Sequence, residues 1–373
     1  MSSYLNIGLG TINNKGVLKM SKKGMHLWAA VKDNAGDFIL GPATRFWFEK
    51  HVLRNEVAIE WTKHNCRSKF YTQGWVENLN QNYDYLVVGG GGLFLPDSKA
   101  SVTSPSRWQW RISTADMSLI TIPIYVVSVG YNLFYNQTVA MPFKDNSQTR
   151  RKNTNIFKES VETLINKSEY FSMRHHGDIQ NIKELLDESV HDKIHFQFCP
   201  TIEFSQEVAE LHNIHNDNRK IWAIEIKDDR KFRRYYNTSE SKVYEDLMKF
   251  IVYMKQTHNI EIKTFFQDNS RSFHRYLKKK KINFGAIDNT RGNVKERLKN
   301  YANVDVLFCM AGHSQMIGHA MGCRIVSLIT HNKLKYFLED IGEYKDNNYV
   351  DINKDNIYDK LVKIGEHLVK EGR

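Results

Sequence analysis

Residues 304–342 read VDVLFCM, AGHSQMIGHAMG, CRIVSLI and THNKLKYFLEDIG in succession, and this stretch decides the fold of the chain. The apolar run at 304–310 has the length of a buried strand. From His313 onwards, apolar residues recur four and seven places on, which is the spacing of one helical face. Residues 324–329 are apolar and β-branched, so they predict a second strand. The segment between the strands is long enough for a helical crossover, and the stretch therefore predicts a βαβ unit with parallel strands.

His313 follows the first of these strands closely and opens the predicted helix. Open α/β sheets bind ligands outside the carboxyl ends of their strands, and a helix N-terminus favours anions. His313 is therefore a candidate acid/base or phosphate-contacting residue, with Ser314 beside it as a candidate substrate-binding residue. A histidine that caps the helix or packs in the core would give the same pattern, so both interpretations stay open at this point.

The composition is that of a folded protein with a basic surface. The chain has 373 residues, which favours two domains over one core. Hydrophobic residues make up 41% and aromatic residues 12%, a balance that excludes a disordered chain. The net charge of +11 suits an anionic small molecule, a phospholipid surface or nucleic acid, and does not choose among them. Residues 1–24 lack the apolar core of a signal peptide, and no apolar run is long and unbroken enough to span a bilayer.

Neither the cysteines nor the histidines predict a metal site. The four cysteines have no zinc-ligand spacing, which indicates a reduced, intracellular protein. His175, His176 and Asp178 stand close together in the sequence, but adjacent histidines point to different sides of an extended chain. No acidic cluster completes a ligand set. We therefore expect no metal.

Glycine-rich segments follow predicted strands in the first half of the chain. The strand at 25–31 leads through a polar loop, DNAGD, into a helix at 38–53, and Asp37 is placed to cap that helix or to contact a substrate. The strand at 83–88 runs into Gly89–Gly92. Four glycines are costly in backbone entropy, so a loop that approaches a ligand closely is favoured over a tight corner. Neither the Walker pattern nor GxGxxG is present.

The chain divides into two alternating α/β series and a short tail. The predicted N-terminal domain, residues 1–205, holds the glycine-rich loop and a strand ending at Arg174, a candidate anion contact. We expect a polar surface loop at 144–155 and the domain linker at 205–219. Strands and helices alternate again in the predicted C-terminal domain, residues 219–342, so each domain should hold a parallel sheet covered on both faces. A helical tail is expected at 343–373.

Several short segments, taken as a set and in order, resemble the polysaccharide pyruvyl transferase family. They are NAGD at 34–37, YLVVGGGGL at 85–93, the strand at 124–130, SMR at 172–174, and the block 313–342 with its THNKLKYF. The resemblance implies two Rossmann-like domains whose parallel sheets face each other across a cleft, as in the glycosyltransferase-B fold. It also implies transfer of pyruvate from phosphoenolpyruvate to two hydroxyls of a sugar, forming a cyclic ketal in capsule or exopolysaccharide biosynthesis.

The resemblance assigns roles residue by residue. His313 becomes the catalytic residue. Arg174 and Lys333 would hold the phosphate and carboxylate of the donor. The remaining candidate substrate-binding residues are Asn34, Asp37, Gly90, Gly91, Gly92 and Ser314. Phosphoenolpyruvate serves as donor substrate and no cofactor is expected. The partners implied are phosphoenolpyruvate and a saccharide acceptor, either free or lipid-linked at the inner membrane face, and no nucleic acid is expected. The protein itself is expected in the cytoplasm, either free or peripheral at the inner membrane surface.

One position departs from the family pattern, which reads Arg-x-His where this chain has Ala311-Gly312-His313. Either Arg174, Lys227, Arg230 or Arg324 supplies the missing charge, or the activity has drifted. Two alternatives to the pyruvyl transferase therefore stay open: a nucleotide-sugar glycosyltransferase on the same two-domain plan, and a binding protein for acidic glycans. The sequence leaves the acceptor sugar and the oligomeric state undetermined.

Overall fold

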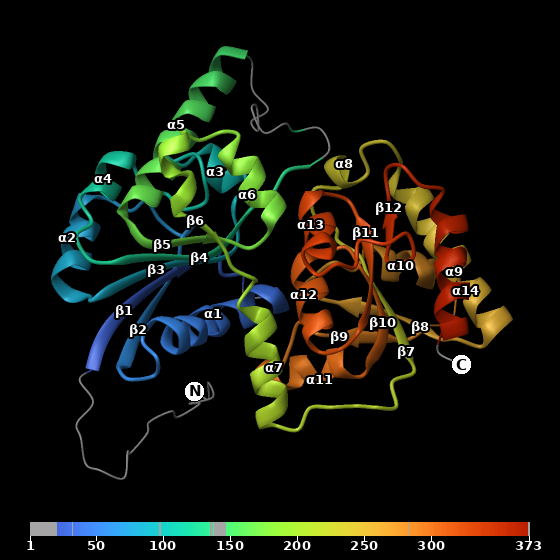
Figure 1. The fold of residues 1–373 in the computed structure, drawn as a ribbon. Helices are drawn as coiled ribbons and strands as arrows, with labels where there is room; N and C mark the ends of the chain where they lie inside the picture. Colours follow the sequence, from blue (N-terminus) through green and yellow to red (C-terminus); the bar gives the residue numbers. More distant parts are fainter. Residues whose placement is uncertain are drawn as a thin grey trace, which may run out of the picture.

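The computed structural model describes residues 21–31, 33–96, 98–134, 137, 147–282 and 284–371. Two α/β domains lie side by side, each built on a six-stranded sheet (Figure 1). All ladders between the named strands are parallel. The predicted pair of Rossmann-like domains with parallel sheets is thus confirmed.

The first sheet has the order β2-β1-β3-β4-β5-β6. Its strands are β1 Ser21–Trp28, β2 Ala58–Asn65, β3 Tyr85–Phe94, β4 Ile124–Tyr131, β5 Ser168–Met173 and β6 Ile194–Phe196. The helices of this part are α1 Ala35–Trp47, which continues as a π-helical turn Phe48–Val52, α2 Gln73–Asn82, α3 Lys99–Val102, α4 Thr114–Ser118, α5 Ser147–Lys167, α6 His176–Lys183, a 3₁₀ turn Glu188–Lys193, and α7 Thr201–Leu211.

The second sheet has the order β12-β11-β10-β7-β8-β9. Its strands are β7 Ile221–Glu225, β8 Ile262–Phe266, β9 Ala286–Asp288, β10 Val304–Cys309, β11 Arg324–Ile329 and β12 Tyr349–Asp351. The helices are α8 Lys231–Arg234, α9 Glu240–His258, α10 Ser272–Lys279, α11 Val294–Ala302, α12 Gly312–Ala320, α13 Asn332–Asp340 and α14 Ile357–Glu371. The βαβ unit predicted from residues 304–329 is β10-α12-β11, with β10 paired parallel to β11.

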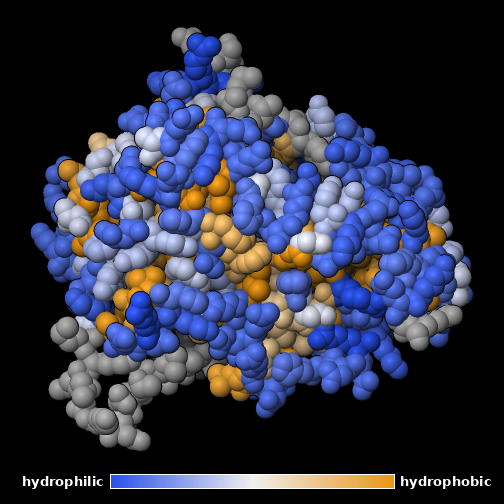
Figure 2. All heavy atoms as spheres, viewed as in Figure 1, coloured by the Kyte–Doolittle hydropathy of each residue, from blue (hydrophilic) through white to orange (hydrophobic). Residues whose placement is uncertain are grey.

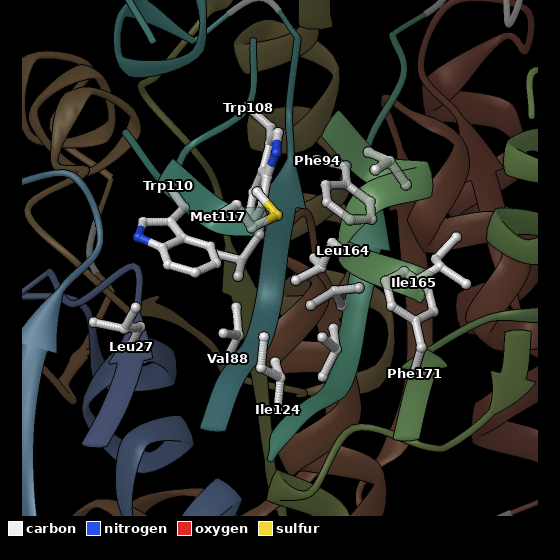
Figure 3. Packing of buried hydrophobic residues seen from close by; sticks show 14 of the residues in the cluster. Leu27, Val88, Phe94, Trp108, Trp110, Met117, Ile124, Leu164, Ile165 and Phe171 are labelled. Carbon is white, nitrogen blue, oxygen red and sulfur yellow. The ribbon is translucent and has the colours of Figure 1, made fainter. Parts of the chain in front are cut away.

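Aromatic packing fills the core of the first domain. Phe94, at the end of β3, stands edge-on to Trp108 with ring centroids 5.2 Å apart, and both are fully buried (Figure 3). The indole N–H of Trp108 donates to Ser160 Oγ at 2.9 Å, so its polar atom is satisfied inside the core. Trp108 is therefore a core residue.

A separate apolar cluster joins the two domains. It contains Ile39 of α1, Phe204 and Val208 of α7, and Tyr301 and Ile317 of the second domain. In Figure 1, α7 stands between the two sheets, and in Figure 2 hydrophobic atoms gather along the middle of the same face, where the domains meet. This shared core holds the sheets with their carboxyl edges on either side of one cavity.

Four expectations differ from the structure. Gly89–Gly92 belong to β3 and form no loop, because the chain passes through them still paired to β4. The surface loop at 144–155 is helical from Ser147 onwards. The linker at 205–219 begins as α7, since Phe204 and Val208 are buried against both domains. The tail at 343–373 is part of the second domain, because β12 pairs with β11 and α14 buries its apolar face in that domain's core.

Candidate active site

A cavity of about 500 Å³ opens between the two domains. Segments that follow strands of both sheets line it, as expected for ligand sites of open α/β sheets. Among the described residues, six arginines and lysines line it against three aspartates, so this lining carries an excess of positive charge. These charged residues are Arg67, Arg174, Lys227, Arg230, Arg234 and Lys333 with Asp37, Asp229 and Asp268. The cavity therefore favours an anionic ligand.

His313 lies in this cavity in the first turn of α12, with 12% of its side chain exposed. Its Nδ1 stands 3.5 Å from Asp37 Oδ1, and its Nε2 is buried without a hydrogen-bond partner among the described residues. Burial lowers the pKa of His313 well below its usual value, and the nearby cations Arg174 and Lys333 lower it further. His313 is therefore neutral at neutral pH.

Asp37 comes from the first turn of α1 and faces His313 across the domain boundary. Burial raises its pKa to about 6, while Arg67, Lys227 and other cations oppose the rise. The expected capping role of Asp37 is wrong. Asn34 is the N-cap: its Oδ1 accepts from the backbone N–H of Gly36 at 2.9 Å and of Asp37 at 3.2 Å. Both residues line the cavity.

Gly90, Gly91 and Gly92 form the floor of the cavity beside α1. Gly90 has φ +59° and Gly91 has φ +84°, a region that side chains with a Cβ rarely adopt. A Cβ on Gly90 would also stand 2.4 Å from Leu40 Cδ1, and one on Gly91 would stand 4.0 Å from His313 Cε1. The positive φ angles and the close contact with Leu40 of α1 therefore favour glycine here, whereas the approach of Gly91 to His313 would leave room for a Cβ.

Arg174 follows β5 and is almost fully buried at the cavity wall. Its Nη2 donates to Asn132 Oδ1 at 2.7 Å, and its Nε lies 3.9 Å from Asp178 Oδ2. A Cβ on Gly130 would stand only 2.4 Å from Arg174 Nε, so the guanidinium packs directly on that glycine. These contacts fix the guanidinium before any ligand arrives.

Lys333 reaches the cavity from the first turn of α13 and lies over Gly312 at the start of α12. Burial lowers its pKa well below the usual value, and the neighbouring cations Arg174 and Arg234 lower it further. An anion bound here would raise that pKa and favour the charged ammonium. Ser314 is different. It is fully buried beside Tyr301, whose hydroxyl lies 3.5 Å from Ser314 Oγ, and it does not line the cavity.

The structure also shows which of the four basic residues considered above could supply the charge of the arginine in the family pattern. Arg174, Lys227 and Arg230 line the cavity. Arg324 does not, because its guanidinium pairs with Asp305 at 2.6 Å. Arg234 was not foreseen: it lies in α8, donates to Thr330 Oγ1 at 3.0 Å and lines the cavity.

Several lining residues were missed, although one signal could have found them. Asn132 and His331 each stand within two residues after a strand, at the carboxyl edge where ligands bind. Gln267 follows β8 in the same way. The position just after a strand would have identified all three. Among the described residues no group of three or more His, Cys, Asp or Glu could hold a metal ion.

The family is established by a comparison with protein-family models. The model of polysaccharide pyruvyl transferase matches residues 34–332, which is most of the chain. The chain belongs to this family. None of the curated proteins compared with it matches significantly. Within the described part of the chain, no helix has both the length and the apolar character needed to cross a membrane.

Solved structures resemble this pyruvyl transferase family member in fold alone. A Listeria monocytogenes protein described as a UDP-N-acetylglucosamine 2-epimerase has a TM-score of 0.53 at 12% identity, covering 95% of this chain and 89% of that one. The UDP-GlcNAc 2-epimerase of Methanocaldococcus jannaschii has a TM-score of 0.51 at 13% identity, covering 93% and 92%. These neighbours share the glycosyltransferase-B arrangement of two Rossmann-like domains.

Proposed function

We propose that this protein transfers the pyruvyl group of phosphoenolpyruvate to two hydroxyls of one sugar residue, forming a cyclic ketal in a surface polysaccharide such as a capsule or exopolysaccharide. The family membership supports a pyruvyl transferase. The observation that supports phosphoenolpyruvate as the donor is the composition of the cavity, where a buried neutral histidine lies among arginines and lysines. A donor with both a phosphate and a carboxylate matches that excess of positive charge.

Each candidate residue has a task in this reaction. Arg174, held in place by Asn132, binds one anionic group of the donor, and Lys333 binds the other. Lys227 and Arg230, in the same cavity, supply the charge that the family arginine provides elsewhere. Gly90–Gly92 leave room for the substrates beside His313.

His313 moves the protons. When the donor binds, its phosphate and carboxylate raise the pKa of His313, which then carries a proton. Protonation of the methylene carbon of phosphoenolpyruvate gives a methyl group and an oxocarbenium-like centre at the neighbouring carbon. One sugar hydroxyl adds there and loses its proton to a base. Phosphate then leaves, and the second hydroxyl closes the ketal with loss of its proton. Asp37, 3.5 Å from His313 Nδ1 and with a pKa of about 6, is placed to take up or return a proton.

The acceptor in this proposal is a cytoplasmic saccharide, and its attachment to a lipid at the inner membrane face would agree with the basic net charge of the chain. No metal or cofactor enters the scheme.

Calorimetry with phosphoenolpyruvate and with UDP-N-acetylglucosamine, followed by phosphate release in the presence of saccharide acceptors, tests the proposal. We expect phosphoenolpyruvate to bind and phosphate to appear only with a suitable acceptor. Binding of the nucleotide-sugar alone would favour a glycosyltransferase. Binding of acidic glycans without any phosphate release would indicate a binding protein.

A further inference from the structure

A second cavity, of about 370 Å³, adjoins the charged cavity and has a different chemistry. Phe134 and His331 line both cavities, and their rings stack with centroids 5.0 Å apart and planes inclined by 19°. The backbones of the two residues also form an antiparallel bridge between the domains. The stacked pair is therefore a wall that the two cavities share.

The second cavity combines aromatic rings with hydrogen-bonding groups. Tyr336 of α13 lines it and accepts a hydrogen bond at its hydroxyl from Asn181 Nδ2 at 2.9 Å. Tyr344 also lines it, with 39% of its surface exposed, and its ring stacks on Tyr349 with centroids 4.6 Å apart. Aromatic faces that carry a polar tip suit ligands with both apolar C–H faces and hydroxyls.

This cavity carries less charge than the first. Among the described residues, two lysines line it against one aspartate. Lys354 Nζ lies 3.2 Å from Asp351 Oδ2, and Lys335 Nζ lies 3.2 Å from Oε1 of Glu339, which is outside the lining. Lys335 also stands 5.5 Å from the ring centroid of Tyr344. Since each lysine is paired with a carboxylate, the cavity offers a phosphate or carboxylate less positive charge than the first cavity does. Its donors, acceptors and rings fit an uncharged sugar.

We propose that the second cavity binds the uncharged sugar residue of the acceptor next to the one that receives the pyruvyl group. This inference rests on the proposed function, because it takes the first cavity as the place of reaction. It makes the protein selective for oligosaccharide acceptors over single sugars. Binding energy from this remote unit would be used to orient the reacting hydroxyls.

Tyr344→Ala tests the proposal, because the ring of Tyr344 is exposed and can be removed without opening the core. Tyr236→Ala is the matched control: Tyr236 is 55% exposed and lines neither cavity. The probes are a panel of defined oligosaccharides of galactose, glucose, mannose and N-acetylhexosamines, one to four residues long. Binding to the wild-type protein and both variants is measured on an array and then by calorimetry.

We expect at least one disaccharide or trisaccharide to bind the wild-type protein about tenfold or more tightly than its terminal monosaccharide, and Tyr344→Ala to remove most of that gain. Tyr236→Ala should keep it. Wild-type affinity for the longer glycan in Tyr344→Ala would overturn the proposal, as would the absence of any length-dependent binding. Titration of the same three proteins with phosphoenolpyruvate separates this proposal from the proposed function. If the wild-type protein does not bind phosphoenolpyruvate, the proposed function is contradicted. If Tyr344→Ala loses glycan binding but still binds phosphoenolpyruvate, the loss is specific to the second cavity.

Discussion

The contact between Gly36 and His313 allows one sharp prediction, for the substitution Gly36→Ala. A methyl group at Gly36 would stand 2.4 Å from His313 Cβ, 2.5 Å from Nδ1 and 2.6 Å from Cγ. Carbon atoms that pack well are about 3.5–4.0 Å apart, so the imidazole must shift by roughly 1 Å. Gly36 lies in the first turn of α1, and that helix is anchored in the shared core through Ile39. The closest contact is to His313 Cβ, which rotation about the side-chain bonds cannot move, so α12 must shift locally and carry the imidazole with it.

The expected loss is large in rate and small in stability. A displacement of about 1 Å at a reacting group can cost about a hundredfold in rate. Alanine gains up to about 1 kcal/mol over glycine in a helix, whereas overpacking costs about 1–3 kcal/mol. The free energy of unfolding should therefore fall by no more than about 3 kcal/mol. Phosphoenolpyruvate affinity should change little, because Arg174 and Lys333 are untouched.

Initial rates of acceptor-dependent phosphate release measure the effect, and urea unfolding confirms that the variant is folded. Gly74→Ala is the control: this glycine lies in α2, and a Cβ there would meet no atom within 4 Å. We expect Gly74→Ala to be as active as the wild type. Wild-type turnover in Gly36→Ala would refute the idea that the position of His313 governs the reaction.

Four further predictions follow from the same contacts. His313→Gln keeps much of the size but cannot titrate, so turnover should fall about a hundredfold with donor affinity nearly unchanged; near-normal turnover would make His313 a binding residue only. Arg174→Ala and Lys333→Ala should each weaken phosphoenolpyruvate binding at least about tenfold in calorimetry, and unchanged affinity in both would remove them from the donor site. Asp340 lies 2.8 Å from His175 Nδ1 and joins α13 to the end of β5, so Asp340→Asn should lower the free energy of unfolding by about 1–3 kcal/mol in urea; an unchanged midpoint would contradict this. Burial lowers the pKa of His175 to about 4, so the unfolded chain binds the extra proton between pH 6.5 and 4, and stability should fall as the pH drops through that window. The loss attributable to His175 is about 2 kcal/mol between pH 7 and 5, and His175→Gln should show a correspondingly smaller drop, whereas equal pH dependence would count against the assignment.

Much of the fold was predictable because it rests on local periodicity. The alternation of apolar strands and amphipathic helices predicted two parallel sheets, and residues 304–329 predicted β10, α12 and β11 nearly residue by residue. The same reasoning placed His313 and Arg174 at carboxyl ends of strands, and both line the cavity. A strand end is a property of the local sequence, so a candidate site at such an edge can be identified without tertiary information.

What the sequence determined by itself was thus the order of elements and the edge of each sheet at which ligands would meet the chain. Only the tertiary structure decided that Asn34 caps α1 while Asp37 turns to His313, that Ser314 is buried away from the cavity, and that the glycines stay in strand β3. These features depend on how α1 and α12 pack across the shared core. Contacts between distant segments leave no periodic pattern of apolar residues in the sequence of either segment. The second cavity has the same origin, since residues of α13, of β12 and of the segment between them line it together only once β12 has joined the sheet.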